Sequence, residues 1–463
     1  MRTDDFRFDA DALAEALFAD PGIPRHTSFL VALSGGADST ALVHALATMQ
    51  RERALQLRAL HVNHGLHRQA DAWGGHCGRL CQALGVPLSI VNVSVTPRGR
   101  GMEAAAREAR YAALRAVMHD GEVLLTAHHR DDQAETLLLN LLHGAGVTGL
   151  AAMAPWQRFG GGWHLRPLLR FRHAALVDYC RSQGLAWIED SANGDLRLQR
   201  NWLRHAVMPR LAERVPRTDE LLARSAAHMR DAMAVLDDVG NADLIACVLS
   251  ASAGPTGFAA PLSARALAAL SAPRQRNLLR YWMKRQGFEM PDAKKVEALR
   301  ALAGGNFRAG HARVAFRDGQ MGRFHDGLFL LPQFNTSPAG DMPWTMRSAL
   351  ALPGTGTQLR AETGDTGANG ASLVETLRGR NLVVRLRRGG ERMRLPGHKH
   401  RHSLKNLLHD HGMPPWWRER APLVYANGEL VAVANLAVSA PFAAPAGEPA
   451  LRLIWERDAT QRQ

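Results

Sequence analysis

Over the first 150 residues, short apolar runs alternate with amphipathic stretches. Runs of strand length cover residues 29–33, 55–62, 86–95 and 122–127. The stretches between and after them repeat apolar side chains at helical spacing, over residues 39–50, 70–84, 103–118 and 132–143. A further short helix is expected within residues 1–20. Strands separated by helices of about 10–15 residues imply right-handed crossovers. The pattern therefore predicts an α/β fold built on a parallel sheet.

The pattern changes near residue 215. A long amphipathic stretch and alanine-rich helices follow, then short strands joined by glycine turns over residues 304–331. Near the end, two alternating runs flank Asn427-Gly428, which predicts a hairpin. We therefore predict four parts: an α/β domain (1–215), a mainly helical domain (216–334), a linker rich in Gly, Pro, Thr and Ala (335–375) and a small α+β domain (376–463).

Length and charge narrow the function. At 463 residues the chain is too long for one core. It carries 57 Lys and Arg against 43 Asp and Glu, a net charge of +14, which favours a polyanionic partner. The four cysteines make neither a disulfide framework nor a zinc motif in a chain of this size. No signal peptide or membrane-spanning apolar run is recognised, so we expect a cytoplasmic protein without a membrane segment.

A polar, glycine-containing segment joins the first strand to the first helix. It reads Ser34, Gly35, Gly36, Ala37, Asp38, Ser39 and Thr40. Paired glycines and a helix N-terminus aim backbone N–H groups at one point, where a phosphate chain binds favourably. The hydroxyl groups can donate to phosphate oxygens, and Asp38 can hold Mg²⁺. The alternative is an ordinary strand-to-helix turn with Ser39 or Thr40 as its cap. Neither a Walker A loop nor a dinucleotide fingerprint is present.

Ligands of parallel sheets collect beyond the carboxyl ends of the strands, which selects further candidates. His128 and His129 follow the fourth strand, and Asp132 and Glu135 share a face of the next helix. The two acids could instead form a capping box, and one histidine could be a core residue. A helical stripe containing Arg107 could likewise be an ordinary surface ion pair.

Taken together, these motifs resemble a known family. The Ser34–Ser39 segment resembles the loop of the PP-loop ATP pyrophosphatases. The tRNA(Ile)-lysidine synthetases within that family are similar in five stretches, namely residues 34–39, 61–65, 103–111, 126–136, and Asp190–Asn193 with Arg200-Asn201. The resemblance covers most of residues 25–210, and parts of the last domain are similar as well.

The resemblance implies a fold, a reaction and a set of roles. It implies a PP-loop catalytic domain (1–215) followed by tRNA-binding domains (216–334 and 376–463). ATP would adenylate the C2 oxygen of the wobble cytidine in the isoleucine tRNA with a CAU anticodon, and the ε-amine of L-lysine would displace AMP. The expected catalytic residues are Asp38, Arg107, His129 and Asp132. Ser34 to Ser39 would bind ATP, Asp38 would bind Mg²⁺, and Asp132 with Glu135 would bind lysine. The expected tRNA contacts are Arg200, Asn201, Arg204, Arg388 and Lys405.

Other functions remain to be separated from this one. A PP-loop tRNA thiolase would carry a C-x-x-C pair, which the sequence lacks, and an amidotransferase-coupled relative would need a glutaminase domain. A non-catalytic RNA-binding protein that holds ATP structurally is a third alternative. The oligomeric state is left open, a homodimer included, and the His398–His402 cluster is expected to contact phosphate rather than a metal.

Overall fold

The computed structural model describes residues 7–18, 28–53, 55–96, 101–190, 194–250, 254–305, 312–333, 340–364, 372–445 and 448–458. The chain divides into two compact units, Met1–Val235 and Leu236–Gln463. The division falls inside one long helix, α10 (Thr218–Cys247), whereas the sequence predicts a boundary at residue 215. Each unit is described by itself.

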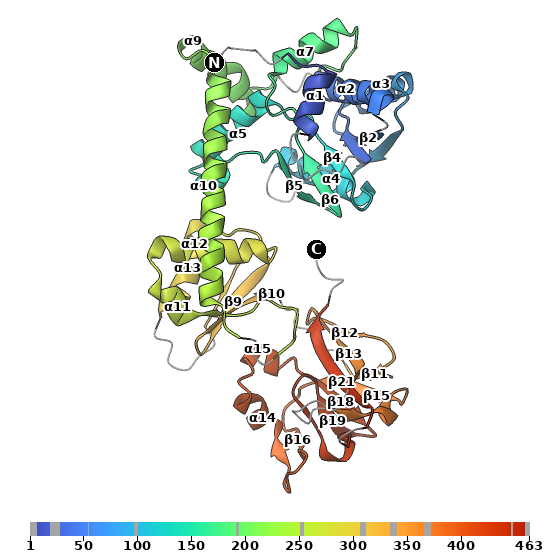
Figure 1. Cartoon of the computed structure of the whole chain (residues 1–463), viewed down its shortest axis with the longest axis vertical. Coiled ribbons are helices and arrows are strands. Elements are labelled where there is room, and N and C mark those ends of the chain that lie inside the picture. Colours follow the sequence, from blue (N-terminus) through green and yellow to red (C-terminus); the bar gives the residue numbers. More distant parts are fainter. Residues whose placement is uncertain are drawn as a thin grey trace. The chain divides into compact units, whose positions relative to one another are not determined.

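A six-stranded sheet organises the first unit (Figure 1). Its order is β3-β2-β1-β4-β6-β5, and all neighbours are parallel except β5 and β6. The strands are β1 (Ser28–Ala32), β2 (Gln56–Asn63), β3 (Leu88–Asn92), β4 (Val123–Leu125), β5 (Trp156–Phe159) and β6 (Gly162–Leu165). The predicted parallel sheet and its four strands are confirmed. The β5–β6 hairpin, which extends the sheet beyond β4, is an addition.

Helices cover both faces of this sheet. The helices of this unit are α1 (Ala10–Phe18), α2 (Ala37–Arg53), α3 (Ala70–Leu84), α4 (Met102–Val117), α5 (Arg130–Leu142), α6 (Val147–Leu150), α7 (His173–Ser182), α8 (Gln199–Trp202), the π-helix η2 (Leu203–Val207) and α9 (Met208–Arg214). Strand β1 shows why two layers form. Phe29 and Val31 belong to the larger core, which includes α1, α2 and α7, and Leu30 joins a smaller core with Leu114 of α4. Alternate side chains of a strand point to opposite faces, so both faces of β1 are apolar and buried.

The second unit begins with helices beside a small sheet. Helices α11 (Ala264–Ala269), α12 (Ala272–Arg285) and α13 (Ala293–Gly304) share a core with the antiparallel sheet β7-β10-β9-β8. Its strands are β7 (Leu262–Ser263), β8 (Arg313–Ala315), β9 (Gly319–Phe324) and β10 (Gly327–Pro332). The region predicted as mainly helical is therefore helical with an attached sheet, and the predicted short strands joined by glycine turns are present.

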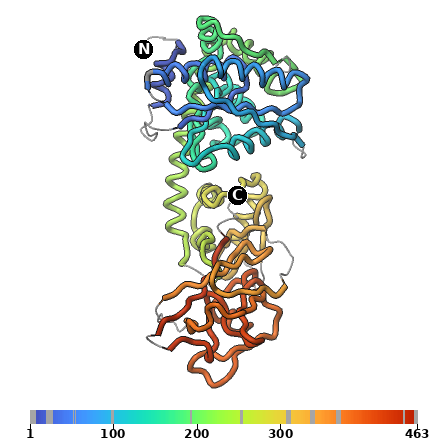
Figure 2. Tube along the Cα trace, turned by 90° about the vertical axis from the view of Figure 1, so that its right-hand side faces the viewer, coloured from blue at the N-terminus to red at the C-terminus, as the bar shows by residue number. Residues whose placement is uncertain are grey.

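The rest of the second unit contains two larger antiparallel sheets. One has the order β11-β15-β18-β19-β20, and the other β12-β13-β21-β14. Their strands are β11 (Met342–Trp344), β12 (Leu350–Leu352), β13 (Thr357–Gly364), β14 (Leu373–Val374), β15 (Leu382–Leu386), β18 (Pro422–Ala426), β19 (Glu429–Val433), β20 (Ala437–Val438) and β21 (Ala450–Arg457). The hairpin predicted at Asn427-Gly428 joins β18 to β19, with φ of 50° and 83° at the two turn residues. Short elements β16 (Arg392–Met393), β17 (His402–Ser403), α14 (Leu404–Asp410) and α15 (Pro415–Arg418) lie between β15 and β18. Figure 2 shows the trace of this part in orange and red.

The predicted linker is wrong for residues 340–364. This stretch contributes β11, β12 and β13, and β13 pairs with β21 from Thr357–Arg457 to Gly364–Ala450. Its Leu359 is fully buried. Gly, Pro and Thr are frequent in this stretch and hide the alternation of a sheet strand. Composition alone therefore gives the wrong assignment here. The flanking residues 334–339 and 365–371 lie outside the described part.

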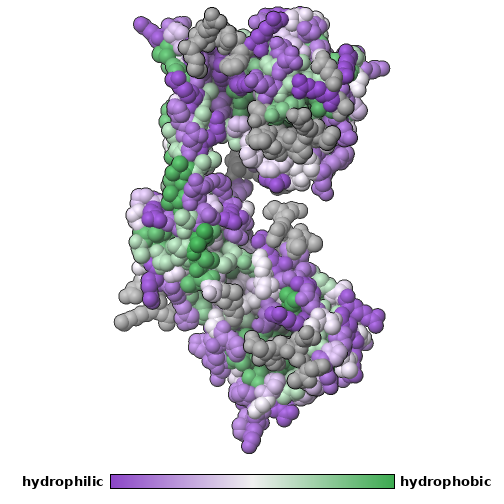
Figure 3. All heavy atoms as spheres, in the orientation of Figure 1, coloured by the Kyte–Doolittle hydropathy of each residue, from purple (hydrophilic) through white to green (hydrophobic). Residues whose placement is uncertain are grey.

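The visible surface is mostly hydrophilic (Figure 3), with exceptions along α10, where Val235, Leu236 and Ile245 are exposed. Over the described ranges, no helix is both long and apolar enough to cross a membrane.

Candidate active site

The turn between β1 and α2 is braced by its own hydroxyl groups. Ser34 Oγ lies 3.0 Å from Ser39 Oγ. Ser39 Oγ also accepts the Gly35 N–H (3.1 Å) and donates to the Gly36 carbonyl (3.1 Å). Helix α2 begins at Ala37, and the first N–H groups of a helix have no partner within it. The predicted phosphate loop therefore has the form of an anion site, a shaped turn leading into a helix N-terminus.

The two glycines of this turn are not equivalent. Gly35 has φ of +88°, and a Cβ there would lie 2.4 Å from Ile188 Cδ1. The Gly35 carbonyl also accepts the Ile188 N–H at 2.9 Å, so residue 188 closes over the turn. At Gly36 the nearest atom to a Cβ would be Ser34 Oγ at 3.7 Å, which is ordinary contact. Position 35 therefore requires glycine, whereas position 36 leaves an open side for a ligand.

Three side chains from three different helices meet beside the turn. Asp38 lies in the first turn of α2, His129 precedes α5, and His173 opens α7. Asp38 Oδ1 is 2.7 Å from His173 Nδ1, and Asp38 Oδ2 is 3.7 Å from His129 Nε2. Asp131 Oδ2 lies 3.3 Å from His129 Nδ1 and accepts the backbone N–H of His173 at 2.8 Å. The strand ends thus bring Asp38 and His129 together, as the parallel sheet predicts, and add His173.

Two acids of α5 are bound by two arginines. Asp132 Oδ1 accepts from Arg200 Nη2 (3.0 Å) and Arg204 Nη2 (2.9 Å). Glu135 accepts from Arg200 Nε (2.9 Å) and Arg204 Nε (2.6 Å). The Glu135 side chain is only 1% exposed. Asp132 and Glu135 are both buried, and the arginines predicted to contact tRNA neutralise them in this structure.

Asp132 also caps its helix. Its Oδ2 accepts the backbone N–H of His129 at 3.1 Å and lies 3.4 Å from His129 Nε2. Capping therefore does not compete with the ion pairs, because capping uses Oδ2 and the ion pairs use Oδ1. Glu135 takes no part in a capping box, since its oxygens are bound to Arg200 and Arg204.

The charges of this cluster set its protonation. Burial raises the pKa of the Asp132 carboxyl, but the positive charges of His129, Arg200 and Arg204 outweigh burial and hold that pKa at about 2. Burial lowers the pKa of His129, but the carboxylates of Asp132, Asp131 and Asp38 raise it to about 9. At neutral pH the ligand-free site therefore holds ionised carboxylates around an imidazolium.

A second, basic cluster lies beyond β4. Thr126 Oγ1 is 2.8 Å from both His128 Nδ1 and His164 Nε2, and His164 Nδ1 is 3.2 Å from Arg166 Nη2. Burial, reinforced by Arg166 and Arg107, lowers the pKa of His128 to about 3 and that of His164 to about 2. Arg107 itself is exposed on α4, with its guanidinium 5.0 Å from the Tyr111 ring centroid. This side of the site presents neutral histidines and arginine cations.

A cavity of about 620 Å³ borders both the phosphate turn and the acidic cluster, which is the group of carboxylates around His129. Its lining includes Gly36, Asp38, His129, Glu135 and Arg204. The Asp38 side chain is 28% exposed toward this space. Mg²⁺ in nucleotide sites is held by one or two carboxylates, substrate phosphates and waters. A single carboxylate at the mouth of an anion-binding turn fits that requirement.

Comparison with known proteins bears on what such a site does. The sequence matches the PP-loop domain over residues 9–211, the TilS substrate binding domain over 262–329 and the TilS substrate C-terminal domain over 382–455. The tRNA(Ile)-lysidine synthase of Alkalilimnicola ehrlichii is 40% identical over 439 residues, covering 93% of this chain and 94% of that protein. The synthase of Pseudomonas putida is 40% identical (88% and 92% covered), and that of Coxiella burnetii is 37% identical (91% and 92% covered).

The chain belongs to the tRNA(Ile)-lysidine synthase family. The family resemblance drawn from the motifs is thereby confirmed, and so is the PP-loop fold. Within the described residues, the cavity lining includes six of the site residues predicted in the first unit: Gly36, Ala37, Asp38, His129, Glu135 and Arg204. The lining does not include Ser34, Gly35, Ser39, Asp132, Arg200 or Asn201, and Arg107 belongs to the basic cluster. Asn201 braces the turn before α8 through the Asp195 carbonyl (3.1 Å). Residues 191–193 of the Asp190–Asn193 stretch lie outside the described part.

The sequence analysis did not identify three residues of these two clusters. His173, His164 and Arg166 follow or belong to β6, which the apolar pattern does not reveal. The rule that residues just after a strand matter would have selected Arg166 had that strand been recognised.

The predicted tRNA contacts of the second unit lie near a basic cavity. Arg388 pairs with Asp341 at 2.9 Å, and Lys405 is exposed on α14. The cavity has about 490 Å³, and its cationic lining residues are Arg392, Arg394, Lys399 and Arg401. His398 and His402 pair with each other, Nδ1 to Nε2, at 3.0 Å.

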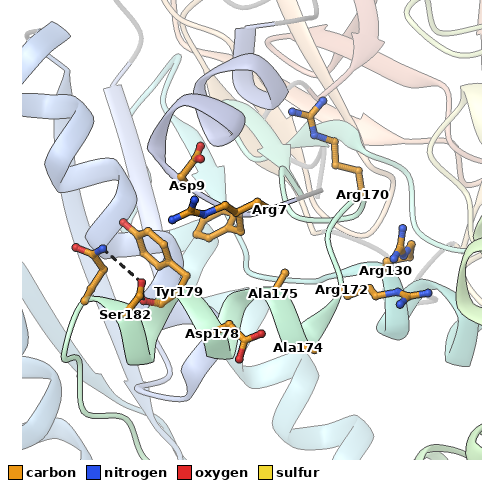
Figure 4. A pocket seen from close by; sticks show the side chains of 12 residues that line it. Arg7, Asp9, Arg130, Arg170, Arg172, Ala174, Ala175, Asp178, Tyr179 and Ser182 are labelled. Atoms are coloured by element: carbon orange, nitrogen blue, oxygen red, sulfur yellow. Dashed lines mark hydrogen bonds between the residues drawn. The ribbon is translucent and has the colours of Figure 1, made fainter. Parts of the chain in front are cut away.

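Another cavity of about 470 Å³ lies on a neighbouring face of α7 (Figure 4). Four arginines line it: Arg7, Arg130, Arg170 and Arg172. Arg130 and Arg172 bind Asp219 at the start of α10 (2.7 and 3.0 Å), and Arg170 pairs with Glu15. These ion pairs tie α10 to the first residue of α5, so the cavity is a structural neighbour of the site.

Replacing Gly35 by alanine should destabilise the first unit by about 1–3 kcal/mol, because the backbone conformation and Ile188 both oppose a Cβ. Gly36→Ala is the matched control and should cost less. Urea denaturation of both variants, followed by far-UV circular dichroism, measures the difference. Equal losses of stability in the two variants would contradict the geometry.

Stability should depend on the proton held by His129. The folded-state pKa of about 9 exceeds the ordinary 6.5, so this contribution is complete below pH 6.5 and is lost as pH rises to 9. Without nucleotide and with EDTA, the thermal midpoint of the native protein should fall more steeply over that range than that of His129→Asn. Parallel curves for the two proteins would refute the prediction.

Proposed function

We propose that this protein catalyses lysidine formation: ATP adenylates the C2 oxygen of the wobble cytidine in the isoleucine tRNA with a CAU anticodon, and the ε-amine of L-lysine then displaces AMP. The observation that carries the proposal is the shared cavity, which is lined both by Gly36 and Asp38 of the phosphate turn and by Glu135 of α5. Relatives named tRNA(Ile)-lysidine synthase, about 40% identical over most of the chain, support it.

In this proposal the first step uses the turn from Ser34 to Ser39. Its hydroxyl groups and the N-terminus of α2 bind the pyrophosphate of ATP, and Asp38 holds Mg²⁺, which supplies charge neutralisation when bound. Phosphoryl and adenylyl transfer need positioning and electrostatic stabilisation more than covalent help from the protein. Arg107 serves the same purpose from the basic cluster, where its positive charge also helps to keep His128 neutral.

The second step needs a site for the ammonium group of lysine. Asp132 is ionised, and both Asp132 and Glu135 are buried, which suits a cation. The arginines occupy Asp132 Oδ1 and both Glu135 oxygens, while Asp132 Oδ2 accepts the backbone N–H of His129 and lies 3.4 Å from His129 Nε2. We therefore assign Asp132 Oδ2 as the principal contact of the lysine amine, with Glu135 completing the negative field. Arg200 and Arg204 hold these carboxylates in place.

His129 is the proposed proton acceptor. Its Nε2 lies between the two functional acids, 3.4 Å from Asp132 Oδ2 and 3.7 Å from Asp38 Oδ2. A base must lie within hydrogen-bonding reach of the amine that it deprotonates. Because His129 is protonated in the ligand-free protein at neutral pH, it must release that proton before it can accept one from lysine.

Binding of tRNA falls to cationic residues of both units. We propose phosphate contacts for Arg388, Lys405 and the basic cavity of the second unit. We also propose tRNA contacts for Arg204, which lines the catalytic cavity, and for Arg200 and Asn201, which precede it in the chain. Since ATP and tRNA are its substrates, we place the activity in the cytoplasm.

The sulfur-transfer alternative finds no support. The four cysteines are all buried. Burial raises the pKa of Cys77 to about 12 and that of Cys81 to about 11, so both thiols stay protonated and unreactive. A thiolase would need an accessible thiolate or a metal–sulfur cluster in the cavity, and neither kind of ligand lines it.

Asp132→Asn should lower lysine incorporation into tRNA by about 10- to 100-fold, because a charged hydrogen bond is worth roughly 1.5–3 kcal/mol. Binding of tRNA should be nearly unchanged. Mass spectrometry of tRNA incubated with ATP and labelled lysine gives the first quantity, and filter binding gives the second. Asp120→Asn, an exposed acid before β4, is the control. Native-level incorporation by Asp132→Asn would remove this residue from the mechanism.

Replacing Lys405 and Arg401 by alanine should weaken tRNA binding and reduce the slope of log K against log salt by about 0.7–0.9 for each phosphate that the variant no longer neutralises. Arg452→Ala, an exposed change on β21, should leave the slope as it is. Fluorescence anisotropy at several salt concentrations measures the slopes. Identical slopes in all variants would show that this surface does not contact phosphates.

A further inference from the structure

His173 has no part in the proposed reaction, yet it lies in direct contact with a residue that does. Its Nδ1 is 2.7 Å from Asp38 Oδ1, and its ring centroid is 5.2 Å from that of His129. The Asp38 carboxylate is therefore flanked by two imidazoles rather than by one. One ligand atom from each of the three side chains lies within 4.8 Å of the others.

These separations suit a single metal ion. Two ligand atoms at about 2.1 Å from a tetrahedral zinc ion are roughly 3.4 Å apart. The observed separations lie on either side of that value: 2.7 Å from Asp38 Oδ1 to His173 Nδ1, and 3.7 Å from Asp38 Oδ2 to His129 Nε2. Small side-chain rotations would therefore bring all three atoms onto one ion, with the cavity leaving room for a water as the fourth ligand.

The donor set determines which ion fits. Two imidazole nitrogens and one carboxylate oxygen suit zinc and the late first-row divalent ions, whereas Mg²⁺ takes oxygen ligands. We propose that Asp38, His129 and His173 form a binding site for zinc or a similar transition ion, which shares Asp38 with the proposed magnesium site. This ion binds without nucleotide, because the protein alone supplies three ligands.

The surroundings of the histidines support this assignment. Metal-bound histidines usually have their second ring nitrogen held by a carboxylate or carbonyl group. Asp131 Oδ2 lies 3.3 Å from His129 Nδ1, which leaves His129 Nε2 facing Asp38. The same Asp131 oxygen accepts the His173 backbone N–H, so one carboxylate contacts the ring of His129 and the backbone of His173. His129 is 4% exposed and rigidly held, whereas His173 is 50% exposed and can close onto an ion.

Binding of such an ion has a consequence that rests on the proposed function. An ion held by Asp38 and two histidines occupies the carboxylate that Mg²⁺ needs beside the ATP phosphates. Zinc should then inhibit AMP release even when Mg²⁺ is in excess, and removal of His173 should relieve the inhibition.

The test uses Co²⁺ as a spectroscopic substitute for zinc in nucleotide-free, full-length protein. The background variant carries His398→Asn and His402→Asn, because that adjacent histidine pair could also bind Co²⁺. We expect one equivalent of Co²⁺ to bind with the intense visible absorption of a low-coordinate, imidazole-ligated ion. Adding His173→Asn should weaken binding by at least about tenfold, since loss of even an outer partner of a metal site typically costs that much. His143→Asn, an exposed change at the end of α5, should not.

Two outcomes would overturn the site: no Co²⁺ bound by the background variant, or equal affinity with and without His173. Thermal unfolding of each variant confirms that it is folded. The titration contains neither ATP nor tRNA, so its result stands whether or not lysidine is formed. If Co²⁺ binds as expected while AMP release never occurs, the metal site survives and the proposed function fails.

Discussion

Two buried carboxylates on α5 depend on two guanidinium groups from a later part of the chain. An unpaired carboxylate as enclosed as that of Glu135 would be costly, and removing one partner of such a pair leaves an uncompensated charge. Arg200 and Arg204 therefore fasten α8 and η2 to α5. The cavity gains a wall from this attachment, since Arg204 and the nearby His205 and Met208 line it. The site is thus completed by electrostatics and not only by the sheet.

The end of β4 separates two regions of the site that carry opposite charge. His128 and His129 are neighbours in the chain, but successive side chains of an extended backbone point in opposite directions. One side chain enters the basic cluster, where its pKa is about 3, and the other enters the acidic cluster, where its pKa is about 9. A single strand end thereby separates a region suited to anions from a region suited to cations. A reaction that activates a cytidine with ATP and then attaches a lysine amine to it needs both regions within reach of one proton acceptor.

The sequence alone was sufficient to predict those features that depend on the spacing of apolar residues and on the positions of strand ends. The parallel sheet, the phosphate turn and the grouping of Asp38 with His129 and Asp132 follow from apolar periodicity and from the rule about carboxyl ends. The β5–β6 hairpin did not, because its strands have four residues each and carry no clear pattern. With it, His164, Arg166 and His173 were missed. The pairing of Arg200 with Glu135 joins positions 65 residues apart, and no local pattern encodes such a contact. The predicted linker was wrong for a different reason. It was inferred from amino-acid composition, whereas the alternation of apolar and polar side chains should have decided the assignment.

The hydroxyl groups of the phosphate turn are already engaged. Ser34 and Ser39 bond to each other, and Ser39 also bonds to both neighbouring glycines. An arriving triphosphate must therefore take over contacts that the empty turn makes with itself, so the gain from those hydroxyls is only the difference between two sets of hydrogen bonds. Discrimination between ATP and a neutral ligand then falls to charge, supplied by the helix end and by the cation proposed at Asp38. The turn therefore holds its shape before the nucleotide arrives. In return, the same hydroxyl groups contribute less to the affinity for the nucleotide.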